Sequence, residues 1–113
     1  MSIATERIYD ESTEQGFRVL VDRLWPRGIK KGTAKIDLWL RDIAPSNELR
    51  RWFAHNPERF EVFRLKYEQE ILSNPVLEQI KVMMAEKELI LVYAARDKQH
   101  NNAVVLAQLL SKI

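Results

Sequence analysis

Cysteine is absent from this 113-residue sequence, and glycine and proline are scarce, with three and four residues respectively. Without cysteine the chain has no disulfide, no thiolate nucleophile and no cysteine-ligated zinc or iron–sulfur centre, which is typical of a reducing compartment. No apolar stretch approaches the ~20 residues of a membrane-spanning helix, and the first residues lack the pattern of a secretion signal. We therefore expect a soluble, cytoplasmic protein that contacts no membrane.

A large net charge is also lacking, because 18 basic and 16 acidic residues give a formal net charge of +2. The basic residues are nevertheless concentrated in one stretch. Residues 18–35 contain six basic residues and one acidic residue, a local charge of +5, so the rest of the chain carries −3. Such a local patch fits an anionic ligand better than a general nucleic-acid coat. The alternative is a solvated, lysine-rich turn.

The strongest pattern that is present is a strand followed by a helix near the end of the sequence. Residues 89–95 form an unbroken apolar run rich in strand formers, which predicts a buried central strand. A polar loop follows, and four apolar residues then fall at helical spacing, namely Ala103, Leu106, Ala107 and Leu110. In α/β sheets the loop that leaves such a strand is a usual place for a ligand.

Three further segments have strand character. Residues 3–9 alternate weakly and predict an edge strand, and residues 17–25 predict a second strand that is apolar on both faces. The connection between them is too short for a parallel crossover, so they would pair antiparallel if they were neighbours. Residues 36–43 fit a strand and a helix equally well, and we favour a short strand.

Helix start signals dominate residues 46–87. Ser46 predicts an N-cap, and the pairs Asn56–Pro57 and Asn74–Pro75 each predict a cap followed by proline in the first helical position. The expected apolar faces are Leu49, Trp52 and Phe53 in the first helix, Phe60, Phe63, Tyr67 and Ile71 in the second, and Leu77, Ile80 and Met84 in the third. With 46% hydrophobic residues, we expect residues 1–113 to form a single α/β domain, with a mixed sheet of about three to four strands packed with about four to five helices.

Two loops of this fold are predicted to meet. Because the last strand is reached only through helices, it can lie parallel to the strand at residues 17–25. Loops 22–28 and 94–102 would then share one edge of the sheet and form a polar, basic pocket. The side chains that we expect to bind a ligand there are Arg23, Trp25, Arg27, Gly28, Arg96, Asn101 and Asn102.

A small anion, preferably one that carries phosphate, is the predicted ligand. The guanidinium groups of Arg23, Arg27 and Arg96 can bind phosphate or carboxylate at two points, and a helix start adds roughly half a positive charge. The alternative is a structural ion network in which Arg23 and Arg96 pair with Asp22 and Asp97.

Acid–base catalysis by His100, with Asp97 or Asp22 orienting its ring, is a second hypothesis, since histidine transfers protons near neutral pH. Neither loop contains a serine or cysteine nucleophile, so covalent catalysis of the common type has no residue to act through. Whether the protein is an enzyme stays open. The alternative is that His100 is a helix N-terminal residue bonded to backbone. His55 and His100 belong to no recognised ligand spacing, so we predict neither a metal nor a cofactor.

An interaction module is the alternative function. Trp25 and Arg27 lie in a glycine-containing loop, residues 25–31, that could stack on a base or anchor a partner protein. Nucleic acid ranks low because the sequence lacks a helix-turn-helix, zinc or RNA-recognition signature. Trp25 could equally fold back over the core. The oligomeric state does not follow from these patterns.

Three separated blocks resemble the YeaO-like family of small bacterial proteins of unknown function: RVLVDRLWPRG, WFAHNPERF and LVYAARDKQHNNAVVL. The resemblance covers nearly the whole chain and implies a compact α/β domain, with no established activity to carry over. Wider relatives carry cysteines near the loop after the last strand. This chain has none, so the resemblance implies no thiol-based role and no Cys–His metal role here.

Overall fold

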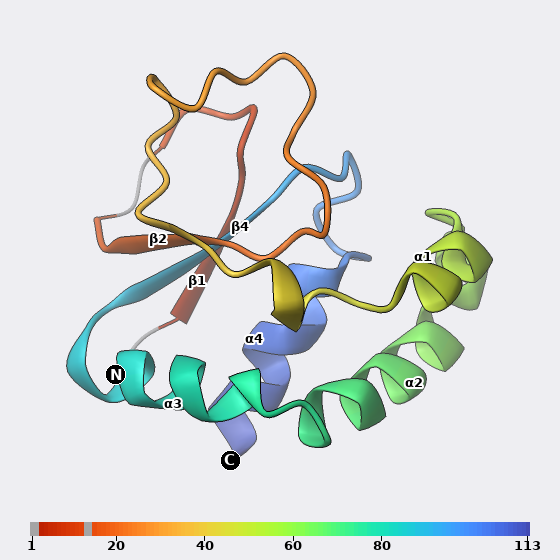
Figure 1. The fold of residues 1–113 in the computed structure, drawn as a ribbon. Helices are drawn as coiled ribbons and strands as arrows, with labels where there is room; N and C mark the ends of the chain where they lie inside the picture. Colours follow the sequence, from red (N-terminus) through yellow and green to blue (C-terminus); the bar gives the residue numbers. More distant parts are fainter. Residues whose placement is uncertain (1–2, 13–14) are drawn as a thin grey trace.

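A parallel β-sheet lies at the centre of the computed structural model, which describes residues 3–12 and 15–113 (Figure 1). Within those residues the sheet has four strands in the order β1-β4-β2-β3. Their bounds are Ile3–Arg7 for β1, Phe17–Leu20 for β2, Leu38–Trp39 for β3 and Leu89–Tyr93 for β4. Strand β4 is buried along its whole length, which confirms the prediction of a buried central strand. The α/β class is also confirmed.

The sheet is parallel throughout rather than mixed. Strand β4 lies between β1 and β2, with Leu89 aligned to Ile3 on one side and to Phe17 on the other. Strands β1 and β2 are therefore not neighbours, and the antiparallel pairing that their short connection suggested does not form. The physical reason is that β4 is apolar on both faces and gains most by taking a central position.

The helices cover one face of this sheet. They are α1 (Asn47–Phe53), α2 (Phe60–Leu72), α3 (Val76–Glu86) and α4 (Asn102–Lys112), and two short 3₁₀ helices occupy Arg41–Ile43 and Pro57–Arg59. Val19, Leu91 and Tyr93 of the sheet pack with the buried side chains of these helices in one continuous core. The expected faces of α2 and α3 are buried as predicted, whereas Trp52 of α1 is 37% exposed and does not belong to the core face.

A loop, rather than a layer of helices, covers the other face. Leu20, Ile90 and Val92 point to this side and pack against Trp25 and Trp39. The two tryptophan rings meet edge to face with their centroids 5.3 Å apart, and the Trp25 indole N–H donates to the Ile29 carbonyl at 2.6 Å. Trp25 therefore folds back over the core, which is the alternative that the sequence left open.

The side-chain bonds of the predicted caps form, but two helices begin later than predicted. Pro57 begins the 3₁₀ helix Pro57–Arg59 rather than α2, and Pro75 is the N-cap of α3 rather than its first residue. The Ser46 hydroxyl accepts from the Leu49 N–H at 3.1 Å, the Asn56 side chain from the Glu58 N–H at 3.0 Å, and the Asn74 side chain from the Val76 N–H at 2.9 Å. Each bond satisfies a backbone donor that would otherwise lack a helical partner. The ambiguous residues 36–43 divide between a two-residue strand and a 3₁₀ turn.

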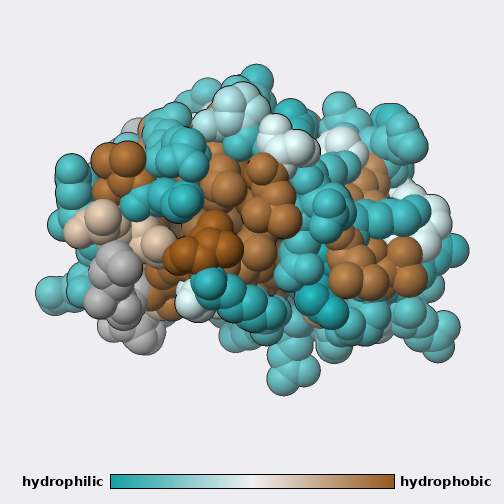
Figure 2. All heavy atoms as spheres, turned by 90° about the horizontal axis from the view of Figure 1, so that it is seen from below, coloured by the Kyte–Doolittle hydropathy of each residue, from teal (hydrophilic) through white to brown (hydrophobic). Residues whose placement is uncertain are grey.

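Figure 2 views the molecule from below, where apolar surface lies in patches separated by polar side chains. Large apolar residues that are exposed include Val62, Leu65 and Leu72 on α2 and Val82 on α3. None of the four lines the cavity described below. Among the described residues, no helix combines the length and the apolar character needed to cross a membrane.

Candidate functional site

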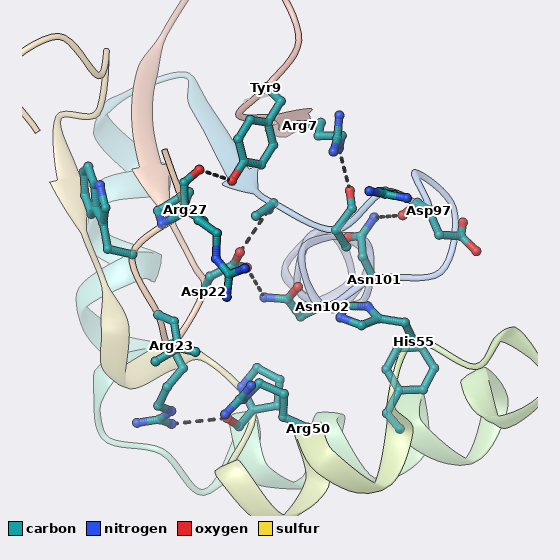
Figure 3. A pocket seen from close by; sticks show the side chains of 18 residues that line it. Arg7, Tyr9, Asp22, Arg23, Arg27, Arg50, His55, Asp97, Asn101 and Asn102 are labelled. Carbon is teal, nitrogen blue, oxygen red and sulfur yellow. Dashed lines mark hydrogen bonds between the residues drawn. The ribbon is translucent and has the colours of Figure 1, made fainter. Parts of the chain in front are cut away.

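A cavity of about 840 Å³ lies where β1, β4 and β2 end, at the carboxyl edge of the sheet (Figure 3). This edge is where ligands bind in open parallel sheets, because the connecting loops diverge there. Loops 22–28 and 94–102 both provide residues to the lining, so the prediction that these two loops meet is confirmed. The lining residues are Arg7, Tyr9, Asp22, Arg23, Leu24, Trp25, Pro26, Arg27, Pro45, Arg50, Phe53, His55, Ala94, Ala95, Arg96, Asp97, Asn101 and Asn102.

Of the ten predicted site residues, eight line this cavity and two do not. Gly28 lies outside the lining and has a φ of +79°, a conformation that glycine adopts without strain. His100 also lies outside the lining, with its ring packed edge to face against Phe60 at 5.0 Å between centroids. The proton-transfer role predicted for His100 therefore has no direct access from this cavity.

Asp22 has both carboxylate oxygens engaged. One accepts from the Ala94 backbone N–H at 2.9 Å and the other from the Asn102 side-chain amide at 3.1 Å. The Asn102 amide also donates to the Val21 carbonyl, so it joins the end of β2 to the start of α4. Burial raises the pKa of Asp22 above its usual range, while the bonds from Asn102 and Ala94 oppose that rise.

We expect the Asp22→Asn variant to gain stability relative to the native chain as the pH rises above about 4. The raised pKa means that folded Asp22 holds its proton where unfolded Asp22 has lost it. Protonated Asp22 contributes fully to the free energy of unfolding at a pH below its pKa in the unfolded chain. This contribution is lost as the pH rises through its pKa in the folded chain. Urea denaturation across this range measures the difference, with the exposed Asp42→Asn as control. A difference that stays constant with pH would contradict the prediction.

Five arginines line the cavity, and three of them make protein contacts. Arg7 Nε donates to the Ala95 carbonyl at 3.0 Å, Arg23 Nη2 to the Ala44 carbonyl at 3.1 Å, and Arg50 Nη2 to the Asn47 side chain at 3.2 Å. The Nε atoms of Arg23 and Arg50 are buried and have no partner in the described chain. A buried donor without a partner costs about 1–3 kcal/mol, which a ligand oxygen would offset.

The other two arginines, Arg27 and Arg96, have side chains that bond to no other group in the part of the chain that the structure describes. Over the same residues, no ion pair joins Arg23 to Asp22 or Arg96 to Asp97. The structural ion network that was the alternative to an anion site is therefore not formed. Figure 3 places Arg7 and Tyr9 on one side of the cavity and Arg50 and His55 on the other.

Asp97 acts within its own loop. Its carboxylate accepts from the backbone N–H groups of Gln99 and His100 and meets the His100 Nδ1 at 2.9 Å. The bond from the Gln99 N–H, followed by that from the His100 side chain, holds the pKa of Asp97 below its usual range. In Figure 3 this carboxylate is turned away from the cavity. His100 precedes the N-cap Asn101 of α4, and its ring contacts the Asp97 carboxylate rather than backbone. The alternative of a backbone-bonded residue within the helix is therefore not matched, whereas the contact between Asp97 and the His100 ring that the catalytic hypothesis expected is present.

Asn101 bonds to the backbone through both polar atoms of its side chain. It is 2% exposed, its side-chain oxygen accepts from the Val104 N–H at 2.9 Å, and its amide donates to the Asp97 carbonyl at 2.9 Å. It is thereby the N-cap of α4, and its polar atoms are occupied.

Outside the two predicted loops, the sequence interpretation missed six residues that line the cavity: Arg7, Tyr9, Pro45, Arg50, Phe53 and His55. The carboxyl end of β1 could have indicated Arg7 and Tyr9, had β1 been recognised as parallel to β4. His55 was considered only as a metal ligand. Ala54 and His55 have positive φ values of 48° and 56°, a conformation uncommon outside glycine. Two such residues in succession direct the chain after α1 toward the cavity, and no turn residue signals this.

Among the described residues, no group of three or more histidine or acidic side chains is placed where it could hold a metal ion.

The fold and the cavity together define an α/β domain with an arginine-rich pocket at the carboxyl edge of a parallel sheet. The chain belongs to the YeaO-like DUF488 family, since residues 2–113 match a family model described as "Inactive DUF488-N3 subclade". It is 38% identical to the uncharacterized protein YeaO of Escherichia coli over the full length of both chains. It is also 38% identical to an uncharacterized protein of Mycobacterium tuberculosis, covering 96% of this chain and 93% of that protein. No solved structure matches.

Proposed function

We propose that the cavity binds a small anionic ligand that carries a phosphate-type group. The observation that carries this proposal is the presence of two arginines without partners, Arg27 and Arg96, in the lining of one pocket. The two residues come from different loops, after β2 and after β4. Guanidinium groups bind phosphate and carboxylate through paired, charge-assisted hydrogen bonds.

The balance of charge around the cavity supports the same ligand. Five arginines line it against two carboxylates, and one of these, on Asp97, is bonded within its own loop. The unpartnered Nε atoms of Arg23 and Arg50 add two buried donors. An anion that reached any of these donors would replace a missing hydrogen bond as well as neutralise charge.

Binding without chemistry is the form of the proposal that we favour. The matched family model is described as an inactive subclade. His100 lies outside the lining, and neither loop has a serine or cysteine nucleophile. The catalytic roles of His100, Asp97 and Asp22 stay a prediction that a turnover assay would have to test.

Thermal unfolding with a panel of anions tests the proposal. A ligand present at ~100 times its dissociation constant should add about 2.7 kcal/mol of stability, which raises Tm by several degrees in a domain of this size. We expect Arg27→Ala and Arg96→Ala each to weaken inorganic phosphate binding about 10-fold, because each removes charge-assisted bonds. The matched control is Arg51→Ala, which removes the same charge from an exposed residue outside the lining.

Two results would contradict the proposal. One is the absence of any shift with phosphate, sulfate, sugar phosphates and nucleotides. The other is an equal loss of affinity in Arg51→Ala and in the pocket variants, which would indicate a diffuse effect of charge.

The interaction module built on residues 25–31 has less support. Trp25 packs on Trp39 and bonds to Ile29, so its ring serves the fold rather than an exposed surface. Lys31 lies over both tryptophan rings, at 5.4 and 5.6 Å from their centroids. A salt-sensitive gel shift with short oligonucleotides, in the absence of any response to small anions, would favour the module instead.

A further inference from the structure

We infer that the ligand is an organic phosphate of the nucleoside monophosphate class, in which hydroxyl donors and a flat apolar ring accompany the phosphate. This inference rests on the proposed function and specifies its ligand. Three features of the cavity carry it: its size, the carboxylate of Asp22 and the exposed apolar side chain of Leu24.

The size of the cavity exceeds what a bare anion can fill. Its volume of about 840 Å³ lies within the range of roughly 300–1,000 Å³ that is typical of pockets for drug-sized ligands. A water molecule occupies about 30 Å³ of liquid, and a phosphate ion has only five heavy atoms. A phosphate would leave most of this space as water, whereas a nucleotide would exclude that water.

The carboxylate of Asp22 disfavours the binding of a bare anion. Its carboxylate lines the same cavity as the arginines, and a phosphate placed beside it would be repelled. Each of its oxygens accepts one hydrogen bond from the protein, while a carboxylate offers about four acceptor sites. The remaining sites suit a ligand that donates, as a pair of sugar hydroxyls does.

Arg50 and His55 lie close enough to Asp22 to favour its charged form. They come from α1 and the residue pair after it, on the side of the cavity opposite Tyr9 (Figure 3). The pocket therefore presents an acceptor and cationic donors to one ligand, which must carry both a negative group and donor groups.

The lining provides an apolar surface for a ring. Leu24 lines the cavity with 61% of its surface exposed, the largest value among the exposed large apolar side chains of the described chain. Pro26 and Pro45 line the same cavity, and so does Phe53, which stacks on Phe63 with centroids 4.2 Å apart. A flat ring that covered Leu24 would remove apolar surface from water, which favours binding.

Isothermal titration calorimetry with four probes tests the inference: inorganic phosphate, ribose 5-phosphate, adenosine 5′-monophosphate and adenosine. We expect the affinity to rise about 10-fold from phosphate to ribose 5-phosphate and about 10-fold again to the nucleotide, as added contacts in a pocket typically give. Adenosine, which lacks the anion, should bind more weakly than the nucleotide.

Two variants separate the parts of the ligand. Leu24→Ala should weaken nucleotide binding several-fold and leave phosphate and ribose 5-phosphate binding unchanged. Asp22→Asn should weaken ribose 5-phosphate and nucleotide binding and strengthen phosphate binding. The control is Val82→Ala, which shortens an exposed apolar side chain on α3 outside the lining. Because Leu24 is exposed, its variant tests the inference even where Asp22→Asn does not fold.

The outcomes distinguish this inference from the function on which it rests. If phosphate and the nucleotide bind with equal affinity, or Leu24→Ala leaves nucleotide binding unchanged, the inference is overturned and anion binding stands. If none of the phosphate-bearing probes binds, both are overturned.

Discussion

Replacing Tyr67 by alanine is expected to lower the free energy of unfolding by about 3–5 kcal/mol, as truncation of a large buried aromatic residue does. Tyr67 is 0% exposed and lies between Phe63 and Ile71 on the inner face of α2. Its hydroxyl donates to the Ile43 carbonyl at 2.7 Å, and burial raises the pKa of that hydroxyl. The truncation would leave a cavity in the core and an acceptor without its donor.

The same substitution should weaken ligand binding, because Tyr67 fixes one wall of the cavity. Ile43, which accepts its bond, precedes the turn to α1, and this turn and helix provide Pro45, Arg50 and Phe53 to the lining. Loss of the anchor would loosen that wall.

Urea denaturation followed by circular dichroism measures the effect of Tyr67→Ala, and Tyr67→Phe is the matched control. Phenylalanine keeps the ring and removes only the hydrogen bond, so a loss of about 1 kcal/mol is expected. If the alanine variant lost no more free energy of unfolding than the phenylalanine variant, the packing of the Tyr67 ring would not stabilise the core as expected.

The second large effect is expected for Asn101→Ala, with a loss of about 2 kcal/mol. Asn101 is the buried polar residue at the start of α4, and alanine would remove both its cap to the Val104 N–H and its bond to the Asp97 carbonyl. A helix cap is worth about 1 kcal/mol, and the buried groups left unsatisfied add to that loss.

Asn56→Ala is the control for this prediction, since Asn56 is also an N-cap, accepting from the Glu58 N–H, but is only half-buried. Loss of a cap alone usually costs about 1 kcal/mol. Chemical denaturation of the two variants gives the comparison. Equal losses would show that burial of Asn101 adds nothing to its capping role.

Asn101 also shows how the fold can engage a residue that the sequence predicts to bind a ligand. The sequence placed it in the loop after the buried strand, and the structure places it in the lining. Its polar atoms nevertheless bond to the chain itself. Asn and Asp side chains serve helix starts and ligands equally well, so residue type alone does not separate the two roles.

The sequence by itself determined the elements whose causes are local. The caps at Ser46, Asn56 and Asn74 were predictable because each side chain bonds to a backbone N–H two or three residues further along. The buried character of β4 was predictable because every one of its residues is apolar. The meeting of the loops after β2 and β4 followed from the parallel pairing of those strands.

Only the tertiary structure decided which segments became neighbours. Strand β4 enters between β1 and β2 from more than 60 residues away, and that insertion makes the sheet parallel and brings Arg7 to the cavity. The packing of α1 also decides the left-handed conformation of Ala54 and His55 and the position of Arg50 in the lining of the cavity. Such long-range contacts depend on the burial of whole faces rather than on nearby residues, so no local pattern in the chain specifies them.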